Sequence, residues 1–384
     1  MNVYLDYNGS APLTKEVEEY LIQRMNKNGP YANPNANHYL GMKCSLGIEK
    51  TRALLASTFS VSKENIVFNS GATEGISSVF NHIYHQFKDA DRKILVLSDI
   101  EHSATINSAK YLEQNFNYEI IKINVLPNGQ INTDQLEEVI SEYESDIKLI
   151  SVMAANNETG VIQPVETVGK LAKQNKILYF CDATQVLGKS EFDFSEVEAD
   201  FLCCSGHKIG ALTGIGALIV NNPDSFIPLI IGGNQENGMR GGTQNYIGIE
   251  TLGIALENLK EKQKFATVVR SSRDRFEAQL KALFPKVIIF GEDSPRVCNT
   301  SYFSIPGLSN SQVQQELQLN KIFVTTGSAC SDKKENLSHV LLSMGFSSEI
   351  INGAVRLSCV MKDNVQCFDY ALHAIREKFH SGIQ

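Results

Sequence analysis

The sequence of 384 residues lacks the features that mark several classes of protein. It has no long block of charge of one sign, and its formal net charge of -8 is spread along the chain, which argues against a dedicated nucleic-acid surface. No apolar run approaches the roughly 20 residues that span a bilayer. We therefore expect no membrane span and no direct contact with nucleic acid, and we expect small molecules or other proteins as partners.

Signatures of metal sites and disulfides are also missing. The eight cysteines include no Cys-X-X-Cys pair and no Cys/His cluster at metal-ligand spacing, so we expect no metal site and no disulfide framework. The N-terminal stretch "MNVYLDYNG" has neither the basic segment nor the apolar segment of a signal peptide. A reducing, cytoplasmic location is the simplest interpretation.

The chain does contain apolar, β-branched runs that alternate with segments of helical period, and its 42% hydrophobic content is enough for two domains. Seven runs predict strands at residues 65–68, 93–98, 118–125, 148–154, 177–182, 201–204 and 216–220. Several are apolar on both faces, as buried parallel strands are. We predict an α/β fold with a large domain of residues 16–259 on a mainly parallel seven-stranded sheet. A smaller α/β domain would comprise residues 1–15 and 260–384.

Two helical stretches stand out. Between about Thr73 and Phe87, apolar residues recur at i, i+3, i+4 and i+7, which predicts an amphipathic helix. A longer helical stretch runs from about Gly248 to Phe284 and leads into the smaller domain.

Polar residues follow most of the predicted strands. In an open parallel sheet, ligands bind outside the carboxyl ends of the strands, so these positions are candidates for chemistry. Taken singly, each has an ordinary structural interpretation, such as a helix cap, a buried histidine or a solvated lysine, and only their joint occurrence favours a site. The candidates are Ala72, Thr73, His102, Asn157, Asp182, Gln185, Ser205, His207 and Lys208.

These residue types together fit pyridoxal phosphate. A lysine amine can form a Schiff base with an aldehyde, a carboxylate can keep a pyridine nitrogen protonated, and an imidazole can stack on the ring. A helix start can hold the phosphate. The expected contacts are the ring nitrogen with Asp182, the aldehyde with Lys208, the phenolic oxygen with Gln185, and the phosphate with Ala72, Thr73, Ser205 and His207.

Eight short segments occur in a fixed order over nearly the whole chain: "SGATEG", "EHSA", "NNETG", "DATQ", "SGHK", "RGGTQN", "GSAC" and "VRLS". In this combination the sequence resembles the cysteine desulfurases of the class V aminotransferase superfamily, in the group with a long cysteine loop. The resemblance implies a PLP-dependent transferase of fold type I that acts as a homodimer. It also implies an enzyme that takes the sulfur of L-cysteine, releases L-alanine and holds the sulfur as a persulfide for an acceptor protein, whose identity stays open.

The resemblance implies roles for single residues as well. Lys208 would be the Schiff-base lysine and move the proton at the substrate Cα, and His102 would stack on the ring and assist proton transfers of the thiols. Asn157 would contact cofactor and substrate, and Arg356 in "AVRLS" would bind the substrate carboxylate as a bidentate fork. Thr243 in "RGGTQN" would reach the phosphate of the neighbouring subunit.

Cys330 lies in the polar stretch "TTGSACSDKKENLS", whereas most cysteines in folded domains are buried and inert. The resemblance implies that Cys330 is the persulfide carrier. It must attack the substrate sulfur inside the site and deliver it outside, so we expect a mobile loop over about residues 326–338. We assign the other seven cysteines to packing.

Three segments depart from the family pattern. "DYNGSAP" stands where relatives usually have an Ala-Thr-Thr-Pro run, "IGALTGIG" lacks the usual proline and lysine, and "RLSCVM" lacks the usual glycine. These departures bear on substrate preference and rate. A selenocysteine lyase, a cysteine lyase or aminotransferase of the same fold, and a non-catalytic binding platform stay open as alternatives.

Overall fold

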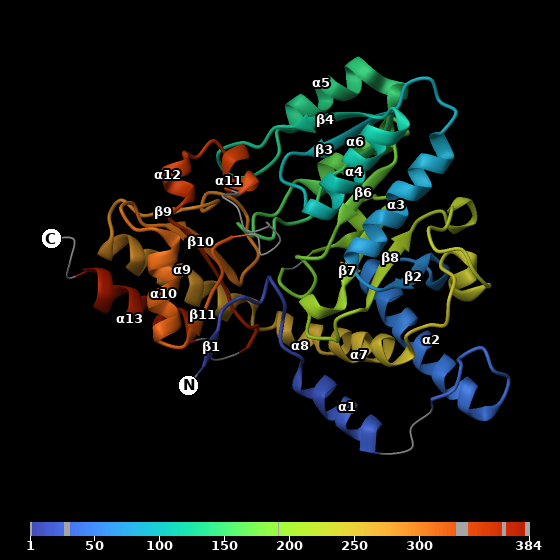
Figure 1. Cartoon of the computed structure of the whole chain (residues 1–384), viewed down its shortest axis with the longest axis horizontal. Helices are drawn as coiled ribbons and strands as arrows, with labels where there is room; N and C mark the ends of the chain where they lie inside the picture. Colours follow the sequence, from blue (N-terminus) through green and yellow to red (C-terminus); the bar gives the residue numbers. More distant parts are fainter. Residues whose placement is uncertain (1, 27–30, 191, 328–336, 363–365, 381–384) are drawn as a thin grey trace.

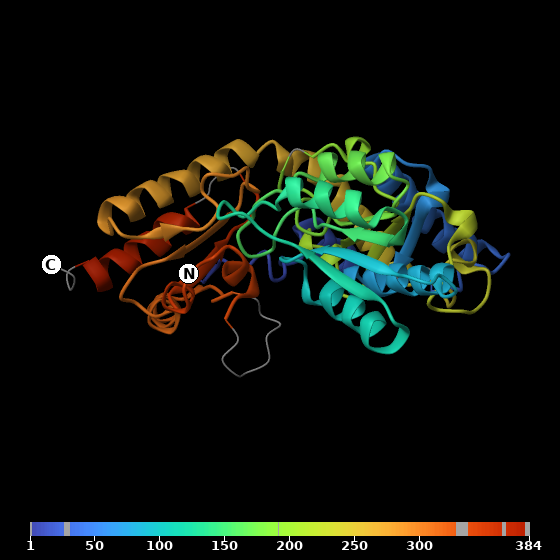
Figure 2. The ribbon, with the colours of Figure 1, turned by 90° about the horizontal axis from the view of Figure 1, so that it is seen from above.

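The computed structural model describes residues 2–26, 31–190, 192–327, 337–362 and 366–380. Figure 1 shows a large sheet with its helices on one side of the molecule and a second group of elements on the other. Both chain ends lie with the second group (Figures 1 and 2).

The large sheet has seven strands in the order β2-β8-β7-β6-β5-β3-β4. Its strands are β2 (Ile66–Asn69), β3 (Ile94–Ser98), β4 (Glu119–Ile123), β5 (Ile147–Ser151), β6 (Tyr179–Asp182), β7 (Phe201–Ser205) and β8 (Gly216–Val220). Each corresponds to one of the seven apolar runs in the sequence. Only β8 runs opposite to the other six strands, so the predicted mainly parallel α/β fold is confirmed.

Helices cover both faces of this sheet. One face packs on α3 (Ala72–Phe87) and α4 (Ser103–Phe116). The other face packs on α2 (Tyr39–Phe59), α5 (Thr133–Tyr143), α6 (Val165–Gln174) and α7 (Tyr246–Glu257), with α1 (Lys15–Asn26) at its border. Alternate residues of the central strands enter the two clusters, and for this reason the strands are apolar throughout.

The second group of elements has a hydrophobic cluster of its own, which includes Leu5, Phe276, Phe303 and Phe368. Its helices are α9 (Ala266–Leu283), α10 (Asn310–Leu319), α11 (His339–Ser343), α12 (Ser348–Ile351) and α13 (Cys367–Phe379), and the short helix α8 (Leu259–Gln263) connects it to the large sheet. Its strands form a sheet β12-β10-β9 and a pair β1-β11: β1 (Val3–Tyr4), β9 (Ile288–Ile289), β10 (Thr300–Ser304), β11 (Ile322–Phe323) and β12 (Ala354–Ser358). The N-terminal strand therefore packs with C-terminal elements. The exact division into residues 16–259 against 1–15 and 260–384 stays a prediction.

Two kinds of feature are absent from the described residues. None of their helices is long and apolar enough to cross a membrane. None of their His, Cys, Asp and Glu side chains gather in a group of three or more that could hold a metal ion.

Candidate active site

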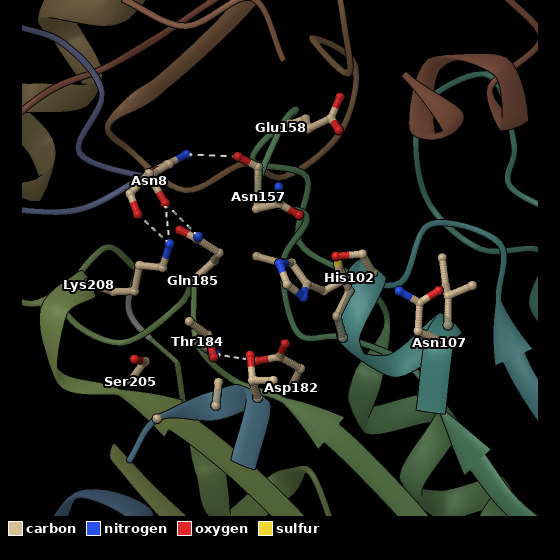
Figure 3. A pocket seen from close by; sticks show the side chains of 18 of the residues that line it. Asn8, His102, Asn107, Asn157, Glu158, Asp182, Thr184, Gln185, Ser205 and Lys208 are labelled. Atoms are coloured by element: carbon tan, nitrogen blue, oxygen red, sulfur yellow. Dashed lines mark hydrogen bonds between the residues drawn. The ribbon is translucent and has the colours of Figure 1, made fainter. Parts of the chain in front are cut away.

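A cavity of about 1120 Å³ lies at the carboxyl ends of β2, β6 and β7, where the large sheet meets the second group of elements. Ten residues singled out from the sequence line this cavity: Ala72, Thr73, His102, Asn157, Asp182, Gln185, Ser205, His207, Lys208 and Arg356. Figure 3 shows many of them in close-up. The nine that end or follow strands of the large sheet come together as expected, and Arg356, which lies within β12, joins them from the second group of elements.

Lys208 ends a short 3₁₀ turn, Gly206–Lys208, that directly follows β7. Its Nζ donates to the backbone oxygens of Asn8, at 2.8 Å, and Gly9, at 2.7 Å (Figure 3). The amine is therefore held inside the cavity against the N-terminal segment. A lysine that served only as a solvated charge would extend its amine into water instead.

Asp182 is the last residue of β6 and is buried. Its Oδ1 accepts hydrogen bonds from the backbone N–H of Thr184, at 2.9 Å, and from the thiol of Cys203, at 3.5 Å. Burial, with the charge of Asp182 acting in the same direction, raises the pKa of the Cys203 thiol. Cys203 therefore stays protonated, and Asp182 is placed as an acceptor that can hold a protonated ring nitrogen.

His102 is the N-cap of α4, and its Nδ1 accepts a hydrogen bond from the N–H of Ala104 at 3.1 Å. Burial lowers the pKa of His102; the charge of Lys208 also lowers it, while that of Asp182 raises it. A neutral ring whose Nδ1 accepts must carry its proton on Nε2, so the backbone fixes the tautomer. The ring can then exchange a proton through Nε2.

The start of α3 can bind an anion. Gly71 precedes the helix with φ 146° and ψ 177°, a conformation that only glycine adopts readily. The first amides of a helix have no acceptor within it, and the helix dipole favours negative charge there. A Cβ on Gly71 would lie 3.4 Å from the hydroxyl of Ser205, so this side chain faces the same space.

His207 lies beside this helix start in the cavity wall. Burial, then the charge of Lys208, lowers the pKa of His207 to about 4, so its ring is neutral at neutral pH. One ring nitrogen, Nδ1, is 3.1 Å from the hydroxyl of Ser10. A neutral imidazole here can still give one N–H to a phosphate oxygen.

Arg356 lies on β12 and is buried. Its Nη1 donates to the backbone oxygen of Asn157, at 2.7 Å, and its Nη2 to Oδ1 of Asp6, at 2.5 Å. Its Nε is buried without a partner among the described residues. Of the two asparagines in "NNETG", Asn156 supports the turn by accepting from the N–H of Glu158, and Asn157 lines the cavity.

The residues fit pyridoxal phosphate. The cavity offers a carboxylate for the ring nitrogen, an amine for the aldehyde and a helix start for the phosphate, each at the end of a different strand. The hydroxyl of Thr184, beside Asp182, is buried without a partner among the described residues, as expected of a wall that a polar ligand completes.

Sequence reasoning missed Asn8 as a site residue. Its backbone oxygen accepts from Lys208 and from Nε2 of Gln185, at 3.1 Å, and its side chain accepts from Nζ of Lys189, at 3.0 Å, and donates to Oγ1 of Thr300, at 2.8 Å. Asn8 and Lys208 are 200 residues apart, so no local pattern links them. The only signal was that Asn8 falls in "DYNGSAP", one of the segments that depart from the family pattern.

Two buried carboxyl groups were missed as well. Glu101 accepts from the hydroxyl of Ser98, at 2.6 Å, and from the N–H of Met153, at 2.8 Å, and burial raises its pKa to about 8. Glu158 accepts from the hydroxyl of Ser338, at 2.5 Å, while its other oxygen has no partner among the described residues. Glu101 lies in "EHSA" and Glu158 in "NNETG", two segments that follow predicted strands. Their position after a strand could have identified them as candidates.

Two predicted site residues are not part of the described cavity. Cys330 lies outside the described residues, with most of the predicted loop, although the next described residue, Leu337, lines the cavity. Thr243 lines a separate cavity of about 180 Å³, whose wall includes Ser70. Ser70 also lines the large cavity, so the two spaces are neighbours.

Comparison with known proteins gives consistent results. Residues 3–366 match the aminotransferase class-V family. The cysteine desulfurase IscS of Clostridium botulinum is 31% identical over 379 residues, which cover 97% of this chain and 93% of that protein. The cysteine desulfurase IscS of Dictyoglomus turgidum is 31% identical over 374 residues, with the same coverage.

Solved structures show the same likeness. A NifS-like protein superimposes with a TM-score of 0.88 at 32% identity, over 98% of this chain and 99% of that one. A structure of SspA in complex with cysteine superimposes with a TM-score of 0.82 at 27% identity, over 94% of this chain and all of that one.

The matches span both the large sheet and the second group of elements, so the similarity is not limited to one domain. Pyridoxal phosphate is the cofactor of this family, and the residues of the cavity fit it. The chain therefore belongs to the aminotransferase class-V family and, within it, to the PLP-dependent cysteine desulfurases.

Proposed function

We propose that this protein removes the sulfur atom of L-cysteine, releases L-alanine and carries the sulfur as a persulfide on Cys330 to an acceptor protein. The observation that carries the proposal is the single cavity that gathers the amine of Lys208, the carboxylate of Asp182 and the guanidinium of Arg356. The relatives named cysteine desulfurase, and SspA with bound cysteine, support the choice of substrate.

Pyridoxal phosphate, when bound, supplies an electron sink that weakens bonds at the carbon atoms of the substrate. In the proposed arrangement Asp182 accepts the hydrogen of the ring nitrogen, and Gln185 donates to the phenolic oxygen. Lys208 would hold the aldehyde, and its amine would move the proton at the substrate Cα. The proposed phosphate partners are Ala72, Thr73, Ser205 and His207.

Two side chains would orient the substrate: Arg356 on β12 and Asn157 in the turn after β5. Arg356 binds the carboxylate of the cysteine, and Asn157 contacts cofactor and substrate. His102, with its proton on Nε2, moves a proton at the substrate thiol. The position of all three side chains in one cavity supports these roles.

Cys330 would attack as a thiolate. A sulfur–sulfur bond forms as the carbon–sulfur bond of the substrate breaks, and the electron pair of the broken bond stays with the carbon, which takes up a proton to give alanine. The described residues on either side of the segment that contains Cys330 adjoin the cavity, which supports the proposed role of Cys330. Before it, the oxygen of Thr325 accepts from the N–H of Arg356 at 2.9 Å; after it, Ser338 donates to Glu158.

The test begins with a visible spectrum of the purified protein. L-cysteine is then added, the alanine formed is quantified, and the mass of the intact protein is measured to detect a persulfide on Cys330. A yellow protein that forms alanine and gains the mass of one sulfur atom supports the proposal. Alanine without a persulfide would instead indicate a lyase, 3-mercaptopyruvate an aminotransferase, and a colourless protein a binding platform. Competition between cysteine and selenocysteine separates the desulfurase from a selenocysteine lyase.

Two substitutions sharpen this test. Cys330→Ala should keep the yellow colour but lower sustained alanine release by about 100-fold or more, because the persulfide cannot form. Lys208→Ala should lose the visible band of the bound cofactor. Cys367→Ala, which also removes a thiol from the second group of elements, is the matched control and should keep both properties. Full turnover in Cys330→Ala would rule out the role of Cys330.

The proposal also covers assembly and location. We propose a homodimer in which Thr243 reaches the phosphate of the partner, and the position of Thr243 outside the cavity of its own chain supports this. We propose a cytoplasmic location, which the seven free cysteines of the described residues support, because thiols persist in a reducing compartment. The acceptor protein stays open.

A further inference from the structure

The guanidinium of Arg356 already has an anionic partner inside the protein. Nη2 of Arg356 lies 2.5 Å from Oδ1 of Asp6, and the two side chains are 2% and 22% exposed. An ion pair in such a buried position is little screened by solvent. The group that would bind a substrate carboxylate is thus already neutralised by a carboxylate of the chain itself.

Two backbone contacts bring Asp6 to this place. Asp6 pairs with Ser358 in a parallel bridge beside β12, on which Arg356 lies two residues earlier. The backbone oxygen of Asp6 accepts from the N–H of Gly9 at 3.0 Å, which closes a tight turn. The turn folds the Asp6 side chain back over residue 9.

Gly9 makes room for the Asp6 carboxylate. A Cβ on Gly9 would lie 2.5 Å from Oδ2, 2.8 Å from Cγ and 2.9 Å from Oδ1 of Asp6, closer than real atoms approach. Gly9 has no positive φ, so its backbone accepts other residues. Space for the carboxylate, and not backbone conformation, is therefore what glycine provides here.

We propose that Asp6, kept against Arg356 by the space over Gly9, competes with the substrate carboxylate and so sets the affinity of the site for α-carboxylates. The inference rests on the proposed function, in which Arg356 binds that carboxylate. A ligand must displace a charge-assisted hydrogen bond that is already present before it can pair with Nη2, which lowers the net gain on binding. Asp6 is partly exposed and can turn toward solvent when it is displaced.

The bond from Nη1 to Asn157 does not involve Asp6, so a second contact keeps the guanidinium in place when the carboxylate leaves. Asp6→Asn keeps an oxygen for Nη2 but removes the competing charge. Gly9→Ala keeps the charge but pushes the carboxylate off Arg356. The two substitutions act on the same contact by different means, and so a folding defect in one does not leave the proposal untested.

The experiment measures equilibrium binding of L-alanine to the holoenzyme by the change in its visible spectrum, because L-alanine has the carboxylate but no sulfur to transfer. Ethylamine, which lacks the carboxylate, is the paired probe. In both variants the Kd of L-alanine should fall about 3- to 10-fold, and the Kd of ethylamine should not change. Asp134→Asn, an exposed residue of α5, controls for the loss of one negative charge and should leave both values unchanged.

Weaker or unchanged alanine binding in Asp6→Asn and Gly9→Ala would overturn the proposal. Weaker binding in particular would mean that Asp6 positions Arg356 and does not compete with the ligand. A natural protein whose spectrum responds to neither L-cysteine nor L-alanine would instead contradict the proposed function itself. The two failures are therefore distinguishable.

Discussion

Among single residues, Glu101 has an unusual charge state that predicts a pH effect. It is fully buried beside the active site, and burial, with a smaller contribution from the charge of Asp182, raises its pKa to about 8. In the unfolded chain the pKa of a glutamate is about 4.3, so between these values the native state binds a proton that the unfolded state releases. The free energy of unfolding should therefore fall as pH rises from about 5 to 8, by at most about 1.4 kcal/mol per pH unit.

Glu101→Gln tests this, because glutamine mimics the protonated form. Urea unfolding should give natural and variant proteins similar stability at pH 5 and an advantage of about 2 to 4 kcal/mol for the variant at pH 8. Buried histidines such as His82 act in the opposite direction, but they are common to both proteins and cancel in the difference. The surface variant Glu137→Gln should show the same dependence of unfolding free energy on pH as the natural protein. If the unfolding free energies of Glu101→Gln and the natural protein change with pH in parallel, the prediction is wrong.

Single residues also show how far the sequence predicts the site. Asp182, His102 and Lys208 were found because each lies at the end of a predicted strand or a few residues after it, and the topology brings strand ends together. Asn8 and Asp6 were not found, because the N-terminal segment brings them to Lys208 and Arg356 only through long-range contacts. No local spacing encodes such contacts, since they depend on how the second group of elements docks.

At the scale of elements, the start of α3 depends on Gly71. Its φ of 146° and ψ of 177° would cost another residue about 1–3 kcal/mol, or the backbone would move. Gly71→Ala should therefore shift the first amides of α3 and weaken the binding of pyridoxal phosphate about 10-fold or more, as measured by titration of the visible band. Gly307→Ala is the matched control, because Gly307 has φ +89° but a Cβ there would meet no atom within 4 Å. Equal cofactor affinity in the two variants would exclude this role for the turn.

The sequence predicted the strands of the large sheet more accurately than the helices that follow it. All seven runs became strands because burial on both faces requires continuous apolar sequence. The predicted helical stretch from Gly248 to Phe284 is instead three helices, α7, α8 and α9. Residues 258–265 contain no glycine or proline to indicate the breaks. The breaks arise from tertiary packing, because Leu259 joins the core of the large sheet and Ala266 joins the second cluster.

At the scale of the whole molecule, α2 presents an apolar stripe to solvent. Tyr39, Met42 and Leu46 follow each other at helical spacing, and all three are more than half exposed. Helix α2 lies at the edge of the molecule in Figure 1. Contiguous exposed apolar side chains usually mark an interface. We expect this α2 stripe to pack against a second copy of the chain, in the homodimer that would bring Thr243 to the partner's phosphate site.

The prediction is tested with the double variant Met42→Glu, Leu46→Glu. By light scattering after gel filtration, the natural protein should have twice the chain mass of 42.5 kDa, and the variant should have the mass of a single chain. Because the monomer lacks the partner's Thr243, its affinity for pyridoxal phosphate should fall by about 10-fold or more. Leu319→Glu, at an equally exposed leucine on α10, should change neither property. A variant that stays dimeric would show that the α2 stripe is not the interface, whereas a monomer with full cofactor affinity would remove the proposed role of Thr243.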